Sequence, residues 1–255
     1  MTFLRESPRS ASRVHHAFVS KVEDAIAAAI EERAQEFDAR KNERVSMTLR
    51  RTSKGGSTEL CLIKAMCIVD QPPVETFATP DATFFHEETT HDSPGIVVEV
   101  KSRWWPKNLA SLAEAYTIGS MGRINCVIGF DISTGQGKLA TVSIWRPDLD
   151  ETGTLTCSNN ADAVMFRDAT GDDQIGGSLE ILLEDLLVDD ARDRIDPCDI
   201  RKPISLDFHF LAKLLDESEG KPVDARSQKQ KDMYPGEYDK RKHWKYLSDI
   251  WRRAK

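Results

Sequence analysis

Apolar residues recur at helical spacing near the start of the chain and alternate with polar residues further on. Over 13–40 the apolar positions fall three or four residues apart and alanine is frequent, which predicts a long amphipathic helix with Ser12 as its N-cap. Apolar and polar residues alternate over 44–51, which predicts a first strand. The strongly apolar stretch 58–69 predicts a second strand.

The next two predicted strands, 80–85 and 95–101, are rich in aromatic and β-branched residues and are bounded by proline, glycine and serine. Helices and strands alternate beyond them, which together predicts an α/β protein. The remaining expected elements are a helix over 108–121 that ends at Gly122, strands over 125–131 and 139–145, strand and loop over 152–167, a helix over 179–187 and a short amphipathic stretch over 204–217.

An acid and an amine interrupt the otherwise apolar strand 95–101. Side chains alternate across a strand, so Glu99 and Lys101 project from one face, and Val98 and Val100 project from the other. Either charge is costly to bury unless it is paired or bound to a metal. Asp81 begins the preceding strand, so two carboxylates and an ammonium meet at one point if the two strands are neighbours.

Two carboxylates at one point suit Mg²⁺, which prefers oxygen ligands and commonly takes only one or two protein carboxylates. Asp81 and Glu99 would hold the ion, which acidifies a bound water and neutralises charge on a phosphodiester. Lys101 would orient or deprotonate the attacking water, or stabilise the developing charge. The plainer alternative is a Glu99–Lys101 ion pair on an edge strand, with Asp81 merely starting a strand after Pro80.

The pattern of Pro80-Asp81, a spacer and then Glu99-Val100-Lys101 resembles the PD-(D/E)XK nuclease superfamily. That resemblance implies a restriction-endonuclease-like core, with a central mixed sheet flanked by helices. It also implies Mg²⁺ or Mn²⁺ as cofactor, hydrolysis of phosphodiester bonds in nucleic acid, with DNA favoured over RNA, and the Val100 carbonyl as a further metal ligand. Members often carry a first-helix glutamate that reaches the metal, and Glu23 is the candidate here; the alternative is a solvated charge.

Residues 78–132 are similar to the Uma2-type branch of this superfamily. That branch carries a helix with a tyrosine, here Tyr116, then a glycine turn and a strand that ends in an aspartate, here Asp131. The chain departs from it at Leu112, because such helices often carry a basic or amide residue one turn before the tyrosine. This departure argues against a fifth active-site residue at this position. It does not affect the roles expected for the two carboxylates and Lys101.

Aromatic and basic residues lie together in two places. Arg103, Trp104 and Trp105 directly follow the Glu99 strand, where tryptophans stack on bases and arginine contacts phosphate, or where they cap the sheet. The second place is the C-terminal segment, where the candidate nucleic-acid contacts are Lys240, Arg241, Lys242 and Trp244. That segment equally suits a nuclear-import signal, or a helix that docks on the core or on a second subunit.

Composition and charge limit the class of protein. The net charge of −7 argues against a protein that coats nucleic acid indiscriminately. Residues 171–220 hold 14 acids and 5 bases, and residues 221–255 hold 11 bases and 5 acids, a reversal that is compatible with a homodimer paired through these segments. Five scattered cysteines without a CxxC pair favour free thiols in a reducing compartment, so we expect an intracellular protein of the cytoplasm or nucleus.

The expected organisation is a flexible lead over 1–12, a nuclease-like domain over 13–217 and a basic, aromatic extension over 218–255. No apolar run is long enough to cross a membrane, so a membrane partner is not expected. The alternative to a nuclease is a catalytically silent module of the same fold that binds nucleic acid or a protein partner without cutting it.

Overall fold

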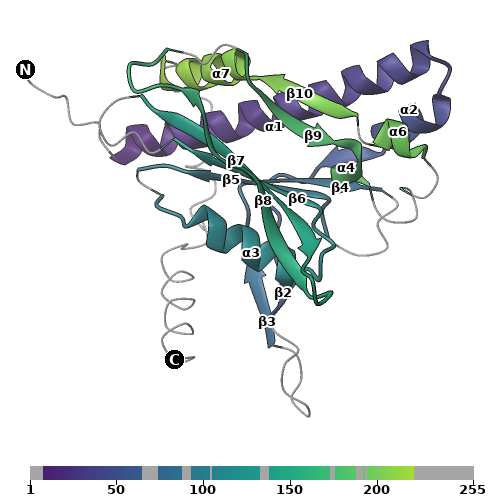
Figure 1. Ribbon diagram of the computed structural model, residues 1–255. Coiled ribbons are helices and arrows are strands. Elements are labelled where there is room, and N and C mark those ends of the chain that lie inside the picture. Colours follow the sequence, from purple (N-terminus) through teal and green to yellow (C-terminus); the bar gives the residue numbers. More distant parts are fainter. Residues whose placement is uncertain are drawn as a thin grey trace, which may run out of the picture. The chain divides into compact units, whose positions relative to one another are not determined.

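Figure 1 shows the computed structural model of the protein, an α/β fold in which helices flank a mixed six-stranded sheet. The residues that the structure describes are 8–64, 74–87, 93–103, 105–132, 138–172, 176–187, 192, 195–200 and 202–220. Among them no helix is long and apolar enough to cross a membrane.

The large sheet has the strand order β1-β4-β5-β6-β7-β8. Its strands β5 and β6 run parallel and every other neighbouring pair is antiparallel. A parallel pair needs a crossover connection, and helix α3 (Leu109–Gly119) supplies it. The strand bounds are β1 Thr52–Lys54, β4 Ala82–His86, β5 Ile96–Lys101, β6 Cys126–Asp131, β7 Ala140–Leu149 and β8 Leu155–Arg167.

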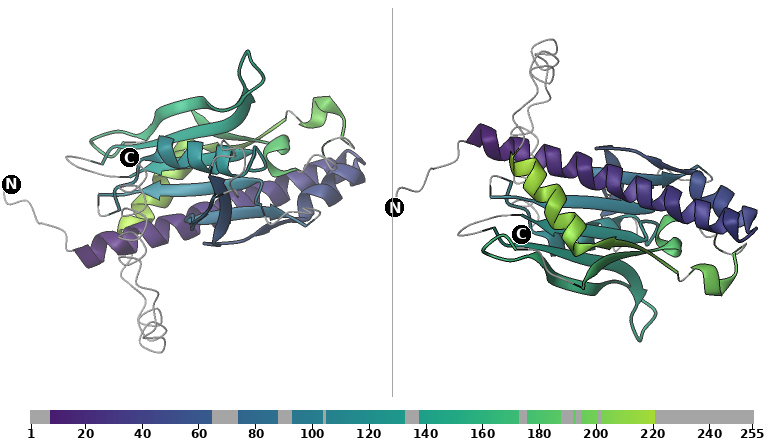
Figure 2. Two further views of the ribbon diagram at one scale, coloured as in Figure 1. Left: turned by 90° about the horizontal axis from the view of Figure 1, so that it is seen from below. Right: turned by 90° about the horizontal axis from the view of Figure 1, so that it is seen from above.

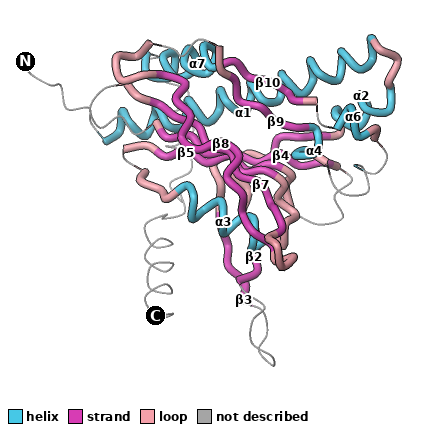
Figure 3. Tube along the Cα trace, in the orientation of Figure 1, coloured by secondary structure: helices cyan, strands magenta, loops and turns pink. Residues whose placement is uncertain are grey.

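Two small antiparallel sheets and further helices complete the described part of the chain (Figure 3). One small sheet pairs β2 (Leu60–Lys64) with β3 (Val74–Ala78), and the other pairs β9 (Ser178–Leu182) with β10 (Pro203–Asp207). The other helices are α1 Pro8–Ala39, α2 Glu43–Arg50, α4 Leu183–Leu186, α6 Pro197–Ile200 and α7 Phe208–Gly220.

The large sheet is covered on both faces. Helices α1 and α7 lie on one face and α3 lies on the other (Figure 2). Val98 and Val100 belong to the core under α1, whereas Val97 belongs to the core under α3, as strand alternation requires. Glu99 and Lys101 therefore share the α3 face of β5, as predicted from the sequence.

Two predicted elements are wrong. Residues 44–51 were expected as a strand, but α2 occupies them, because Val45 and Leu49 are buried one helical turn apart and the side chain of Asn42 caps the Val45 N–H. Residues 179–187 were expected as a helix, but only the single turn α4 is helical, and 179–182 belong to β9. The buried residues Leu179, Ile181 and Leu183 alternate with more exposed ones, which is the period of a strand.

Other predicted elements are confirmed with shifted ends, except that of the expected strand 58–69 only β2 is seen, because 65–69 lie outside the described residues. Helix α1 begins at Pro8 rather than after a cap at Ser12, and proline is favoured in the first turn of a helix. Helix α3 is capped by Asn108, whose side chain accepts from the Ser111 N–H. Gly122 follows that helix with a φ of +76° and donates its N–H to the Thr117 carbonyl, a conformation that glycine adopts without strain.

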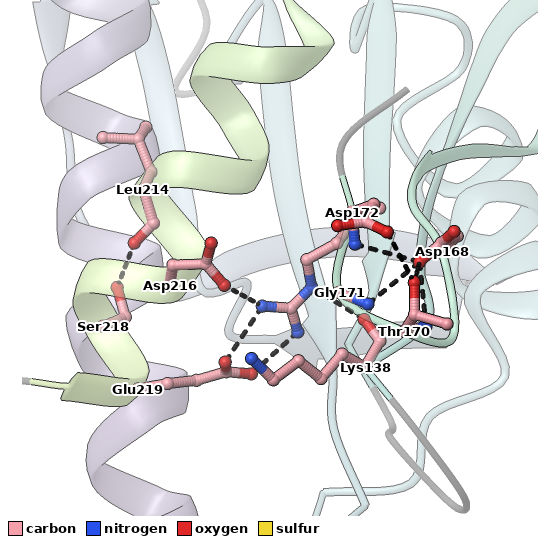
Figure 4. Close-up of polar contacts among 10 residues, drawn as sticks. Lys138, Asp168, Thr170, Gly171, Asp172, Leu214, Asp216, Ser218 and Glu219 are labelled. Atoms are coloured by element: carbon pink, nitrogen blue, oxygen red, sulfur yellow. Dashed lines mark hydrogen bonds and ion pairs between the residues drawn. The ribbon is translucent and has the colours of Figure 1, made fainter. Parts of the chain in front are cut away.

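Helix α7 extends to Gly220, three residues past the expected domain end at 217, and residues 221–255 lie outside the described part of the chain. Arg167, the last residue of β8, fixes this helix to the sheet. Its side chain is fully buried and donates to the Lys138 carbonyl and to the carboxylates of Asp216 and Glu219, both from α7 (Figure 4).

Loss of the two α7 carboxylates is expected to destabilise the protein strongly. The double change Asp216→Ala and Glu219→Ala leaves the buried Arg167 cation without a counter-ion, so the free energy of unfolding should fall by about 3–5 kcal/mol in urea denaturation. The matched control removes an exposed pair, with Lys54→Ala and Asp24→Ala, and should leave stability nearly unchanged. Equal effects of the two double variants would contradict this role for Arg167.

Candidate metal and active site

Asp81 and Glu99 come from neighbouring strands and meet at one end of the β4–β5 ladder. Ala82 pairs with Val98 in that ladder, so Asp81, one residue earlier, stands beside Glu99. The predicted proximity of the two carboxylates therefore holds. The site lies at the carboxyl end of β5, beside the parallel neighbour β6, a position at which open α/β sheets commonly bind ligands.

A lysine that the sequence analysis did not single out lies between the two carboxylates. The Lys107 Nζ is 2.7 Å from Asp81 Oδ2 and also contacts Glu99 Oε2. Its side chain is only 12% exposed. Lys107 belongs to the connection between β5 and α3, one residue before the cap of that helix. The two carboxylates thus share one cationic partner.

Asp81 is held in its ionised form by groups from three parts of the chain. Its Oδ1 is 3.1 Å from His15 Nε2 of α1, and its Oδ2 accepts the Val100 N–H of β5 at 2.7 Å. Burial by itself would raise the pKa of Asp81, but the hydrogen bond from His15 and the charge of Lys107 outweigh it and hold that pKa well below its usual range. Among the residues that the structure describes, none is hydrogen-bonded to the buried His15 Nδ1 atom.

Glu99 is more deeply buried than Asp81. Its side chain is 3% exposed and accepts a 2.6 Å hydrogen bond from the Tyr116 hydroxyl of α3. Burial raises the pKa of Glu99 to about 7, despite the lowering effect of Lys107 and Tyr116. The same carboxylates raise the pKa of Lys107 against the effect of its own burial, so the lysine stays charged.

Lys101 lies on the same face as Glu99 but has a different partner. Its Nζ is 2.6 Å from Asp131 Oδ2, and Lys101 and Asp131 are paired in the β5–β6 register. The Lys101 side chain is 32% exposed, so its ammonium reaches solvent as well as Asp131. The plainer alternative, a Glu99–Lys101 ion pair, is not what the structure contains.

The first-helix glutamate makes a different contact from the expected one. Glu23 accepts the Gly56 N–H at 3.1 Å, after β1, and its contact helps to hold that turn. His15 is the residue by which α1 reaches Asp81. It lies three residues before Phe18 and seven before Val22, on the apolar stripe of the helix, and a polar residue on that stripe was the available signal.

The predicted nucleic-acid contacts are only partly within the described residues. Arg103 is exposed, and the Trp105 ring lies 6.3 Å from the His15 ring between centroids, next to the site. The remaining predicted contacts lie outside the described part of the chain and stay predictions; they are Trp104, Lys240, Arg241, Lys242 and Trp244.

The donor set fits a small hard cation. Asp81 and Glu99 offer carboxylate oxygens, and a cation, Lys107 Nζ, already lies between them. In a strand the N–H and C=O of one residue point to the same edge, so the Val100 carbonyl lies on the edge that faces Asp81. The described residues contain no group of three or more His, Cys, Asp and Glu side chains arranged for a metal, and Mg²⁺ commonly uses only one or two carboxylates.

Comparisons of the chain with protein-family models, with curated proteins and with solved structures find no significant match.

The raised pKa of Glu99 predicts a specific pH dependence of stability. In metal-free buffer the folded protein keeps the Glu99 proton up to about pH 7, whereas the unfolded chain loses it near the ordinary value of 4.5. The folded state therefore binds more protons between these values, and the Glu99 contribution to stability falls as pH rises. Relative to Glu99→Gln, which cannot ionise, the wild type should lose about 1–3 kcal/mol of unfolding free energy between pH 5 and pH 8.

The measurement is urea denaturation of both proteins in EDTA at the two pH values. A stability difference that stays constant, or that grows in favour of the wild type with rising pH, would show that Glu99 ionises normally.

Proposed function

We propose that the protein is a metal-dependent nuclease of the PD-(D/E)XK class, with a restriction-endonuclease-like fold, that hydrolyses phosphodiester bonds in DNA rather than RNA. The observation that carries this proposal is that Asp81 and Glu99, from neighbouring strands, converge on one cation. Two further features support it: Lys101 shares the face of Glu99, and the Val100 backbone lies against Asp81.

Asp81 and Glu99 are the residues that would hold Mg²⁺ or Mn²⁺. The bound ion would neutralise charge on the phosphodiester and lower the pKa of a water molecule. Asp81 suits this role because its low pKa keeps it ionised at every physiological pH. Glu99 is kept in one orientation by the Tyr116 hydroxyl, and a rigid ligand of this kind favours a defined coordination geometry.

Lys101 is the residue proposed to act on the water and the phosphate. Its ammonium is anchored by Asp131 and partly exposed, so it can donate to a phosphate oxygen or to the attacking water without leaving its place. In the hydrolysis, the water oxygen bonds to phosphorus, the bond to one ester oxygen breaks, and that oxygen receives a proton. The exposed Arg103, beside Trp105, is suited to bind the substrate backbone.

Cleavage of nucleic acid is expected to depend on the divalent ion and on all three residues. The assay incubates the protein and Mg²⁺ or Mn²⁺ with labelled single- and double-stranded DNA and RNA, and the wild type should cut DNA in preference to RNA. Cutting should fall at least ~100-fold in Asp81→Asn, Glu99→Gln and Lys101→Met, since each change removes a ligand or a charge that acts on the transition state. EDTA should abolish it.

The control variants are Asp24→Asn and Lys54→Met, which change the same residue types in an exposed ion pair that is not part of the site. They should cut like the wild type. Activity that persists in Asp81→Asn and Lys101→Met would identify a contaminating nuclease and would remove the basis for the proposal.

One observation favours the alternative, a silent module of the same fold. Lys107 already contacts both carboxylates, so each of them has a cationic partner without a metal. A silent module should bind labelled DNA in EDTA with the same affinity as in Mg²⁺, measured by fluorescence anisotropy, and should release it uncut. Binding that needs the divalent ion, followed by cutting, would exclude this alternative.

A further inference from the structure

We propose that Lys107 is a built-in counter-ion that occupies the cation position between Asp81 and Glu99, and that a divalent metal binds by displacing it. The proposal rests on the metal site of the proposed function. It adds a competition between a tethered ammonium and the metal ion, and so assigns a role to a residue that lies outside the motif of Asp81, Glu99 and Lys101.

Lys107 occupies the space between the two carboxylates. Its Nζ bonds Asp81 Oδ2 at 2.7 Å and contacts Glu99 Oε2, which are the oxygens that a metal shared by the two carboxylates would use. The other lysine of the site, Lys101, bonds Asp131 instead. A metal ion and the Lys107 ammonium therefore cannot both occupy this position.

The burial of Glu99 makes an uncompensated charge there costly. The Glu99 side chain is 3% exposed and the neighbouring Asp81 side chain 16% exposed, and two ionised carboxylates in this position without a counter-ion would be destabilising. In the metal-free protein Lys107 supplies the cation that both carboxylates contact. Once a divalent ion is present, repulsion between like charges drives the ammonium away.

Lys107 lies in a connection rather than in a helix or a strand. Residues 106–108 between β5 and α3 belong to neither a helix nor a strand, so backbone hydrogen bonds of a regular element do not fix the position of Lys107. A lysine side chain is also a flexible stem that turns readily. Displacement requires rotation of one side chain, and the released ammonium becomes available to an anion such as a substrate phosphate.

The competition has a measurable size. A protein whose binding-competent state is only partly populated binds its ligand with an affinity reduced by that fraction. If Lys107 lies between the carboxylates in roughly nine of ten molecules, its removal strengthens metal binding about tenfold. Structural damage from a substitution would weaken metal binding, so a gain in affinity distinguishes displacement from damage.

The test is Mn²⁺ binding to the purified protein without substrate, measured by electron paramagnetic resonance of the free ion. Lys107→Met should bind Mn²⁺ at least about tenfold more tightly than the wild type, and Lys107→Arg, which keeps the charge, should bind it no more than about threefold more tightly. Lys101→Met is the matched control, because it removes the other lysine charge of the site, which bonds Asp131 instead of the two carboxylates, and its gain should be much smaller than that of Lys107→Met. Asp81→Asn, combined with Lys107→Met, should abolish the tight binding.

If Lys107→Met binds Mn²⁺ no more tightly than the wild type, and binding depends on Asp81 in both proteins, displacement of Lys107 is overturned. The metal site itself would still stand. The absence of Asp81-dependent Mn²⁺ binding in all variants would instead overturn the metal site, and the proposed function with it. The two failures are therefore distinguishable.

A second measurement uses the wild type and does not depend on the folding of Lys107→Met. The ammonium of Lys107, assigned by its loss in Lys107→Arg, should give a protected proton–nitrogen signal in NMR spectra of the metal-free protein. Saturation with Mg²⁺ should remove that signal as the ammonium enters solvent. Displacement would be contradicted if the Lys107 signal stayed unchanged while the Val100 amide signal shifted on Mg²⁺ binding.

Discussion

A buried carboxylate, Glu99, lies beside a partly buried one, Asp81, and the positive charge between them organises the site and the elements around it. Asp81 and Glu99 stand at the end of the β4–β5 ladder, and Lys107 meets both. Their surroundings differ: hydrogen bonds and charge keep Asp81 ionised, whereas burial brings the pKa of Glu99 to about 7. One carboxylate is therefore a permanent charge, and the other exchanges its proton near neutral pH.

The layers of the fold explain why these groups meet. Helix α1 covers one face of the sheet and brings His15 to Asp81, while α3 covers the other face and brings Tyr116 to Glu99. The crossover that makes β5 and β6 parallel also supplies the connection that carries Lys107. The same pairing places Asp131 next to Lys101. The site thus depends on packing on both faces of the sheet, and each partner comes from an element with its own place in the core.

Strand alternation was enough to place Glu99 and Lys101 on one face, and the apolar pattern predicted α1, α3 and β6. The prediction was wrong over 44–51, where a short amphipathic stretch fits both periods and Asn42 decides in favour of a helix. It also did not single out Lys107 and His15 as site residues. Lys107 lies in a connection, where no periodicity reports direction, and its role follows from a carboxylate 26 residues away in the chain. His15 was visible only as a polar residue on an apolar stripe.

The most direct measurement of the cation site is anomalous scattering from crystals of the protein grown with Mn²⁺. We expect a manganese peak bonded to the carboxylates of Asp81 and Glu99, with the Lys107 ammonium moved away from both. A map without manganese at these two residues, in which Lys107 still bridges them at saturating Mn²⁺, would contradict a divalent metal site and leave the pair as a structural ion cluster.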